Sequence, residues 1–134
     1  MSSRSGNSIL PFEVAQFFEA TNAGDLTGLL RVFAPDSIVN DQLQEWRGLA
    51  AIGRWAECDV LGQQLSLRPV HCIEHYGHCI VTAQADGNFD KRGLPDPLEV
   101  HLYFTLAEHK IVQLVVLRDL SGTSRLDDLL RGSY

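Results

Sequence analysis

The apolar residues of this chain change their spacing once, near Gln64. Before this point they recur three or four residues apart, as in an amphipathic helix, and after it they alternate with polar residues, as in half-buried strands. Helices followed by a run of strands favour an α+β fold with a curved, mostly antiparallel sheet. The sequence therefore predicts helices packed against a single mixed sheet.

The first half of the chain predicts three helices and one strand. The first helix spans about 11–23, between a proline suited to a first helical turn and a terminating glycine. Asp25 can cap a second, short helix that Pro35 ends, and a third helix follows Gly48. Between the second and third helices we expect a strand over about 37–43, then a loop.

The second half predicts a meander of four strands joined by turns and one loop rich in glycine and proline. Pro69 falls within the first of them, which implies an edge strand or a bulge. The strands are expected at about 64–75, 78–89, 98–106 and 110–119.

Composition and charge narrow the function classes. A chain of 134 residues that is 45% hydrophobic can form one core without disulfides or metal ions. Its formal charge of -6 repels phosphate backbones and anionic lipid, so we expect no nucleic acid and no membrane surface as a partner. The longest apolar stretch, 111–117, is far shorter than the roughly 20 residues of a membrane helix.

The cysteines and the termini complete the expected organisation. The cysteines are three in number, and the N-terminal segment lacks the apolar run of a secretory signal, which together predict reduced thiols in a cytoplasmic protein. We expect a loose leader over 1–10, a domain over 11–119, and a tail over 120–134 that can form a short helix, as a lid or dimer element.

Asp41 is the leading candidate for chemistry. It is the last residue of the stretch 32–41, which predicts the end of a helix, a Pro-Asp turn and then a strand. This strand carries the carboxylate among apolar neighbours. Burying a carboxylate costs desolvation energy, and proteins often accept that cost where the group moves protons. The alternative is a carboxylate at the end of a strand that caps a turn or faces solvent.

Four phrases of the sequence resemble the nuclear transport factor 2-like superfamily, especially its SnoaL-like branch. The resemblance spans about 11–119 and implies a cone-shaped roll of the cystatin-like kind, a homodimer, and a pocket inside the cone. The superfamily includes ketosteroid isomerases, polyketide cyclases, limonene epoxide hydrolase, dehydratases and non-catalytic binding modules, so the fold alone does not fix the reaction. The phrases are Asn22-Ala23-Gly24-Asp25, Phe33-Ala34-Pro35-Asp36, Gly48-Leu49-Ala50-Ala51-Ile52 and His109-Lys110-Ile111.

Two enzymes of the superfamily suggest roles for particular residues. By resemblance to ketosteroid isomerase, Asp41 falls at the general base, His101 at a donor of the oxyanion hole, and Phe17 where a tyrosine donor is expected. By resemblance to limonene epoxide hydrolase, Asp86 matches an acid, and Gln84 replaces its arginine. A single acid/base aspartate, as in a SnoaL-type cyclase, is equally well supplied by Asp86.

Residues two apart on a strand share a face, and the resemblance implies that several such groups point into one cone. Convergent polar groups in an apolar pocket are typical of a small-molecule site. Each candidate residue also has a purely structural interpretation, such as a buried imidazole, a structural ion pair or aromatic core packing. The candidates are Asp41, His101 and Asp86 as catalytic residues, and Phe17, Val39, Trp46, Trp55, Gln84, Tyr103, Leu114, Val116 and Arg118 as ligand contacts.

Residues 71–79 contain two cysteines and three histidines, a density that suggests a zinc site as one interpretation. Strand alternation sends Cys72 and His75 to opposite faces, which opposes a closed tetrahedral site, so we expect no metal. Gly-rich phosphate loops and nucleophile elbows are absent, and we expect no cofactor.

The sequence thus predicts cofactor-free acid/base catalysis, of isomerase, cyclase or hydratase/hydrolase type, on a small apolar carbonyl-like substrate. The alternative is a non-catalytic ligand-binding or dimeric interaction module of the same fold. A homodimer through the outer face of the sheet is expected, because Val112, Val115 and Leu117 give apolar side chains to both faces of the last strand.

Overall fold

The computed structural model describes residues 10–119. The predicted leader, apart from its last residue, and the predicted tail lie outside the described residues. The elements, in chain order, are α1 (Phe12–Ala23), α2 (Leu26–Arg31), β1 (Phe33–Asp41), β2 (Gln44–Arg47), α3 (Leu49–Trp55), the π-helical turn η2 (Ala56–Leu61), β3 (Ser66–His75), β4 (His78–Asp86), β5 (Leu98–Ala107) and β6 (Lys110–Asp119).

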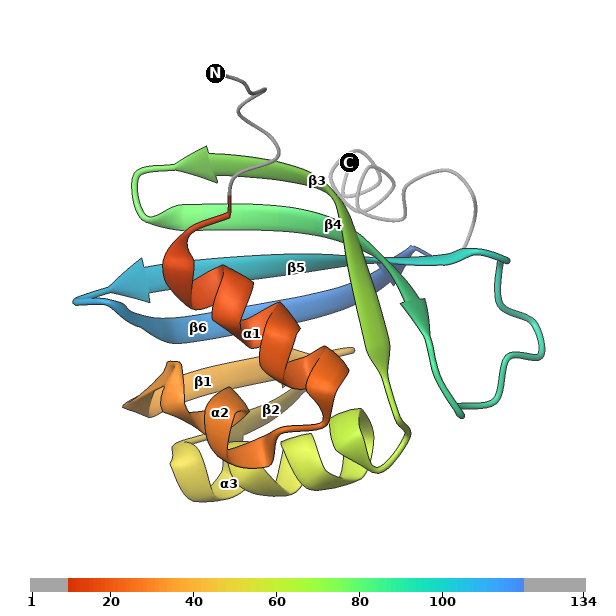
Figure 1. The fold of residues 1–134 in the computed structure, drawn as a ribbon, viewed down its shortest axis with the longest axis horizontal. Coiled ribbons are helices and arrows are strands. Elements are labelled where there is room, and N and C mark those ends of the chain that lie inside the picture. The colour runs from red at the N-terminus through yellow and green to blue at the C-terminus, as the bar shows by residue number, and fades with distance from the viewer. Residues whose placement is uncertain (1–9, 120–134) are drawn as a thin grey trace, which may run out of the picture.

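These elements form an α+β fold, as predicted. The sheet has six strands in the order β2-β1-β6-β5-β4-β3. The pairing of β1 with β6 is parallel and the other pairings are antiparallel, which makes the sheet mixed. Figure 1 shows the sheet curving around α1, with α2 and α3 on the same side below it. The helices and the concave face of the sheet therefore enclose the core.

Local signals explain where the first helices stop and start. Gly24 ends α1 with a φ of 69°, a left-handed conformation that glycine adopts without steric cost. The Asp25 side chain then accepts a hydrogen bond from the Gly28 amide at 3.0 Å and caps α2. Both helices were expected from these residues, and the predicted positions are confirmed.

The structure differs from the expectation around the first strand. β1 begins at Phe33, which pairs with Ile111, and the register then shifts before Ile38. Pro35 sits in this irregular part of the strand, where a missing amide hydrogen is tolerated, so the proline does not delay the strand. The segment predicted as a loop contains β2, because Gln42 and Leu43 both adopt positive φ and turn the chain directly back along β1.

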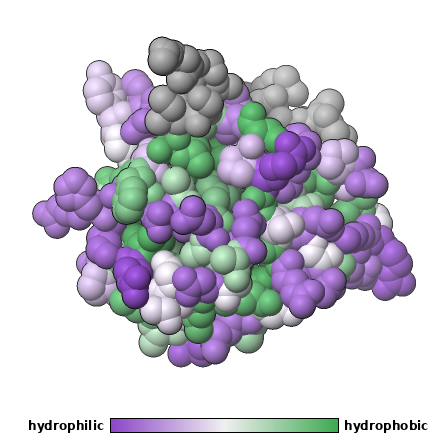
Figure 2. Space-filling model, viewed as in Figure 1, coloured by the Kyte–Doolittle hydropathy of each residue, from purple (hydrophilic) through white to green (hydrophobic). Residues whose placement is uncertain are grey.

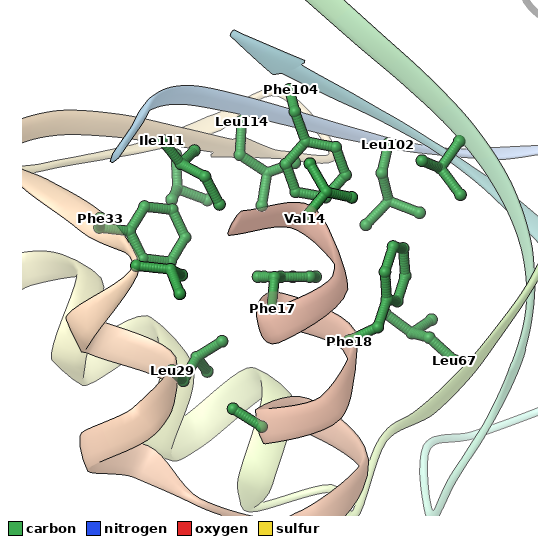
Figure 3. Packing of buried hydrophobic residues seen from close by; sticks show 14 of the residues in the cluster. Val14, Phe17, Phe18, Leu29, Phe33, Leu67, Leu102, Phe104, Ile111 and Leu114 are labelled. Atoms are coloured by element: carbon green, nitrogen blue, oxygen red, sulfur yellow. The ribbon is translucent and has the colours of Figure 1, made fainter. Parts of the chain in front are cut away.

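Aromatic side chains organise the core. Phe17 of α1 lies between the sheet and α2, as Figure 3 shows. Its ring meets those of Phe18, Phe33 and Phe104 edge-on, at centroid distances of 5.4, 6.2 and 5.2 Å respectively. Edge-to-face contacts of this kind stabilise a core beyond simple burial of area. Phe17 thus anchors α1 to the sheet.

The thiols and the histidines of residues 71–79 do not form one cluster. Cys72 and Cys79 turn into the core with their sulfurs 3.3 Å apart, whereas His71, His75 and His78 are exposed. All cysteines are free thiols, and burial, then the Cys72 thiol, raise the pKa of Cys79. Within residues 10–119, no group of three or more His, Cys, Asp or Glu side chains is placed to hold a metal ion.

The surface over the helices mixes hydrophilic and hydrophobic residues, as Figure 2 shows. No helix within the described part of the chain is long and apolar enough to span a bilayer.

Candidate functional site

A cavity of about 200 Å³ opens between the concave face of the sheet and the α3–η2 segment. Its apolar wall combines α1, α3 and several strands, and its polar groups come from β1, β2, β6, η2 and the turns beside them. This cavity is called the pocket below. Its lining residues are Phe17, Asp41, Gln42, Gln44, Trp46, Trp55, Asp59, Val60, Gln63, Leu65, Leu67, Ala85, Phe89, Leu98, Val100, Leu102, Val116 and Arg118.

Asp41 is held in a fixed orientation on the pocket wall. It is the last residue of β1, between Gln44 of β2 and Val116 of β6. The indole Nε1 of Trp55 donates to Oδ2 at 2.9 Å, and Nε2 of Gln42 donates to Oδ1 at 3.0 Å. Each carboxylate oxygen has two lone pairs, so each keeps capacity to accept another proton or hydrogen bond.

The two tryptophans form an aromatic wall beside this carboxylate. Trp55, at the end of α3, is only 3% exposed, and its ring centroid lies 6.4 Å from that of Trp46 on β2. Trp55 therefore has two functions in the structure, since it packs in the core and also orients Asp41. An indole suits this position because its body is apolar and its single N–H needs an acceptor.

Gln42 was not anticipated by the sequence reasoning, although it follows Asp41 directly. Its Nε2 also donates to the Val116 carbonyl at 3.0 Å, and its Oε1 accepts from the Arg118 amide at 3.3 Å. The side chain thereby joins the turn after β1 to the end of β6. This connection fixes the backbone on both sides of the pocket wall.

Arg118 supplies the positive charge of the pocket. The residue is partly buried on β6, and it lines the pocket together with Val116. Within residues 10–118, no carboxylate lies within ion-pair distance of its guanidinium. A guanidinium that lines an apolar pocket is suited to binding an oxyanion.

Asp59 is a second carboxyl group in the pocket that the sequence reasoning missed. It lies on η2, which continues directly from α3. Burial first, and then the negative charge of Asp41, raise the pKa of Asp59 above its ordinary value. The available signal was Val60, which continues the apolar stripe of Ile52 and Ala56 at four-residue spacing and shows that the helical segment extends.

The pocket brings together six of the predicted site residues, which are Phe17, Asp41, Trp46, Trp55, Val116 and Arg118. Val39 and Leu114 also point inward, but both are fully buried in the core and do not line the pocket. They support the wall from behind.

The expected placement of Asp86, Gln84, His101 and Tyr103 inside the cone is wrong. On β4 the inward side chains are Val81, Ala83 and Ala85, and on β5 they are Val100 and Leu102. Because strand side chains alternate, the residues between them point to the other face of the sheet.

Three of these residues have well-defined surroundings outside the pocket. Asp86 is exposed and pairs with Lys91 at 2.6 Å, and that hydrogen bond, followed by one from the Gly87 amide, lowers the pKa of Asp86. Gln84 accepts a hydrogen bond from Arg68, and with Asp86 it lines a separate groove. The Nδ1 atom of His101 lies 3.1 Å from Oγ1 of Thr82 on the same outer face.

Comparisons with known proteins agree with this architecture. The family model described as SnoaL-like domain matches residues 14–114. A candidate polyketide cyclase of Sinorhizobium meliloti superposes with a TM-score of 0.73 and 26% identity, covering 81% of this chain and 95% of the other. A protein of Catenulispora acidiphila with a ketosteroid isomerase-like fold, solved in complex with trimethylamine, superposes with a TM-score of 0.68 and 16% identity. The match covers 81% of this chain and 86% of the other.

A third solved structure, the epoxide hydrolase/cyclase-like enzyme SalBIII, which takes part in pyran ring formation in salinomycin, has a TM-score of 0.66 and 21% identity, covering 79% of this chain and 87% of the other. No curated protein matches the sequence. The fold is that of the nuclear transport factor 2-like, ketosteroid isomerase-like class. Within it, the chain belongs to the SnoaL-like domain family.

Proposed function

We propose that the pocket carries out cofactor-free acid/base chemistry on a small, largely apolar molecule that bears a carbonyl group. The observation that carries the proposal is the Asp41 carboxylate, held by Trp55 and Gln42 on the wall of an apolar hollow. Asp41 takes a proton from the carbon next to the carbonyl, which is the first step of isomerase and cyclase reactions alike. Similarity to a candidate polyketide cyclase supports this reaction class.

Arg118 has the complementary role in this proposal. Loss of the proton leaves an enolate, whose negative charge develops on the carbonyl oxygen. The Arg118 guanidinium lines the same pocket, and preorganised positive charge is more effective there than in water. Arg118 thus replaces His101, the residue expected from sequence to polarise the oxygen, which lies on the other face of the sheet.

The size of the pocket limits the substrate. An engineered apolar cavity of about 150 Å³ binds one benzene molecule. At about 200 Å³, the pocket suits a single ring with small substituents. We therefore propose one-ring enones and diketones as the first substrates to test.

The test uses cyclohex-3-en-1-one, a one-ring ketone whose double bond moves into conjugation when a proton leaves the carbon next to the carbonyl and another joins the far carbon. The conjugated product absorbs in the ultraviolet, so its formation is followed directly. We expect the protein to accelerate this conversion saturably. If neither this ketone nor a panel of one-ring enones and 1,3-diketones is converted above the buffer rate, acid/base catalysis on this class is contradicted.

One observation favours a second candidate, a binding module without turnover. Both oxygens of Asp41 already accept hydrogen bonds from protein donors, as they do in a purely structural carboxylate. In that case a ligand enters the pocket and is released chemically intact. Binding detected by a thermal shift, with no hydrogen–deuterium exchange at the acidic carbons of the ligand, supports this candidate over catalysis.

We also propose that two copies pair through the outer face of the sheet. On β6, Val115 and Leu117 alternate with the inward Leu114 and Val116, and so present apolar side chains to that face. Light scattering is expected to give about twice the chain mass of 14.9 kDa, and a monomer mass at micromolar concentration contradicts the pairing.

A further inference from the structure

Asp59 is the charged residue of the pocket that the proposed function leaves without a role. It reaches the pocket from η2, whereas Asp41 reaches it from β1. Asp59 is exposed, and Asp41 is partly buried. One carboxyl group therefore lies at the mouth of the pocket, in contact with solvent, and the other lies deeper.

The π-helical turn η2 carries Asp59 at the pocket. Ala56 and Val60 are 0% and 1% exposed and anchor η2 to the core. Between them, Glu57, Cys58 and Asp59 are all exposed, but of these only Asp59 lines the pocket. π-helical turns inside helices frequently occur at functional sites.

The electrostatic surroundings of the two carboxyl groups differ. Asp41 accepts hydrogen bonds from two neutral donors, the Trp55 indole and the Gln42 amide. The charged form of Asp59 is opposed by partial burial and by the negative charge of Asp41. When two carboxyl groups of one site lie in different environments, one can act as the base and the other as the acid.

Within residues 10–119, other charged groups also lie in the pocket or on the elements packed against η2. Arg118 of β6 lines the same pocket, and Glu57 lies on the same turn. On the helices packed against η2, Arg31 of α2 and Arg54 of α3 are exposed to solvent. Asp41 is therefore the charged neighbour to which the titration of Asp59 responds.

We propose that Asp59 is a second proton-transfer residue, which links Asp41 and the bound substrate to solvent at the pocket mouth. This inference rests on the proposed function. In the isomerisation of an enone, Asp41 removes a proton from the carbon next to the carbonyl, and Asp59 supplies the proton that joins the far carbon. The proton on Asp41 then passes to Asp59 or to water, so protons balance and nothing is oxidised or reduced.

The isotopic composition of the product tests the link to solvent. With cyclohex-3-en-1-one in D₂O, the wild-type protein is expected to place solvent deuterium at the far carbon of most product molecules. Asp59→Asn is expected to lower this fraction several-fold, because the base returns the hydrogen that it removed. Glu57→Gln, which alters an exposed acid of the same turn, is the matched control and is expected to keep the wild-type fraction.

A titration that needs no substrate tests the coupling of the two groups. In ¹³C NMR, we expect the Asp59 carboxyl to titrate with a pKa above its ordinary value of 3.8. We expect this pKa to be lower in Asp41→Asn than in the wild-type protein. If the pKa of Asp59 is the same in Asp41→Asn as in the wild-type protein, the inference is overturned.

The two hypotheses fail in different ways. If the wild-type protein converts no probe, the proposed function fails and Asp59 loses its role with it. If conversion depends on Asp41 but Asp59→Asn leaves the deuterium fraction unchanged, only the inference on Asp59 is wrong.

Discussion

Asp41→Asn is expected to lower kcat/KM for enone isomerisation by about 10²- to 10⁴-fold, the usual contribution of a general base. The amide keeps the size of the side chain but takes up no proton at neutral pH. It also offers a single acceptor oxygen, so only one of the donors from Trp55 and Gln42 keeps its partner. Steady-state kinetics, with circular dichroism to confirm folding, measure the loss.

Asp36→Asn is the matched control for this variant. Asp36 lies on the same strand, β1, but it is exposed and does not line the pocket. We expect wild-type kinetics from it. An unchanged rate in Asp41→Asn, or an equal loss in Asp36→Asn, removes Asp41 from the proposed chemistry.

Trp55→Ala is expected to lower the free energy of unfolding by about 3–5 kcal/mol, the cost of truncating a fully buried aromatic residue. Trp55 is 3% exposed and packs against Trp46. Trp55→Phe retains most of the apolar volume and loses the N–H donor, so its stability cost is expected to be smaller, about 1–3 kcal/mol. Urea denaturation measures both values.

The pair of substitutions separates packing from orientation of the base. Trp55→Phe is expected to remain folded at 25 °C and yet lose turnover, because Asp41 loses the hydrogen bond to Oδ2. Tyr76→Ala, at an aromatic residue that is 88% exposed, is expected to change stability by at most about 0.5 kcal/mol. Equal stability losses in Trp55→Ala and Tyr76→Ala contradict the packing of Trp55 described above.

Local sequence signals predicted much of the fold. The Gly24-Asp25 pair located the junction of α1 and α2, because glycine and aspartate have specific uses at helix ends. The strand β2 was missed, since the turn that creates it contains Gln42 and Leu43 rather than glycine or asparagine. Pairing of β2 with β1 and hydrogen bonds between Gln42 and β6 stabilise that turn, and neither is visible in the local sequence.

The candidate site was predicted in part. Asp41 and the two tryptophans were identified from local pattern and resemblance, and they do meet in the pocket. Alternation places His101 and Tyr103 on the same face of β5, but alternation does not say which face of a strand is inside. The burial of Val100 and Leu102 decides this, because apolar side chains gain more from the core than polar ones do.

The central claim is that a ligand in the hollow reaches the Asp41 carboxylate, and NMR of the tryptophan indoles tests it most directly. The chain has two tryptophans, and the N–H of Trp55 donates to Asp41 in the pocket wall. Titration with cyclohex-2-en-1-one, the isomerisation product, is predicted to shift the Trp55 indole signal saturably and to leave amides near exposed Tyr76 unchanged. A Trp55 signal that stays fixed while the ligand demonstrably binds contradicts the account.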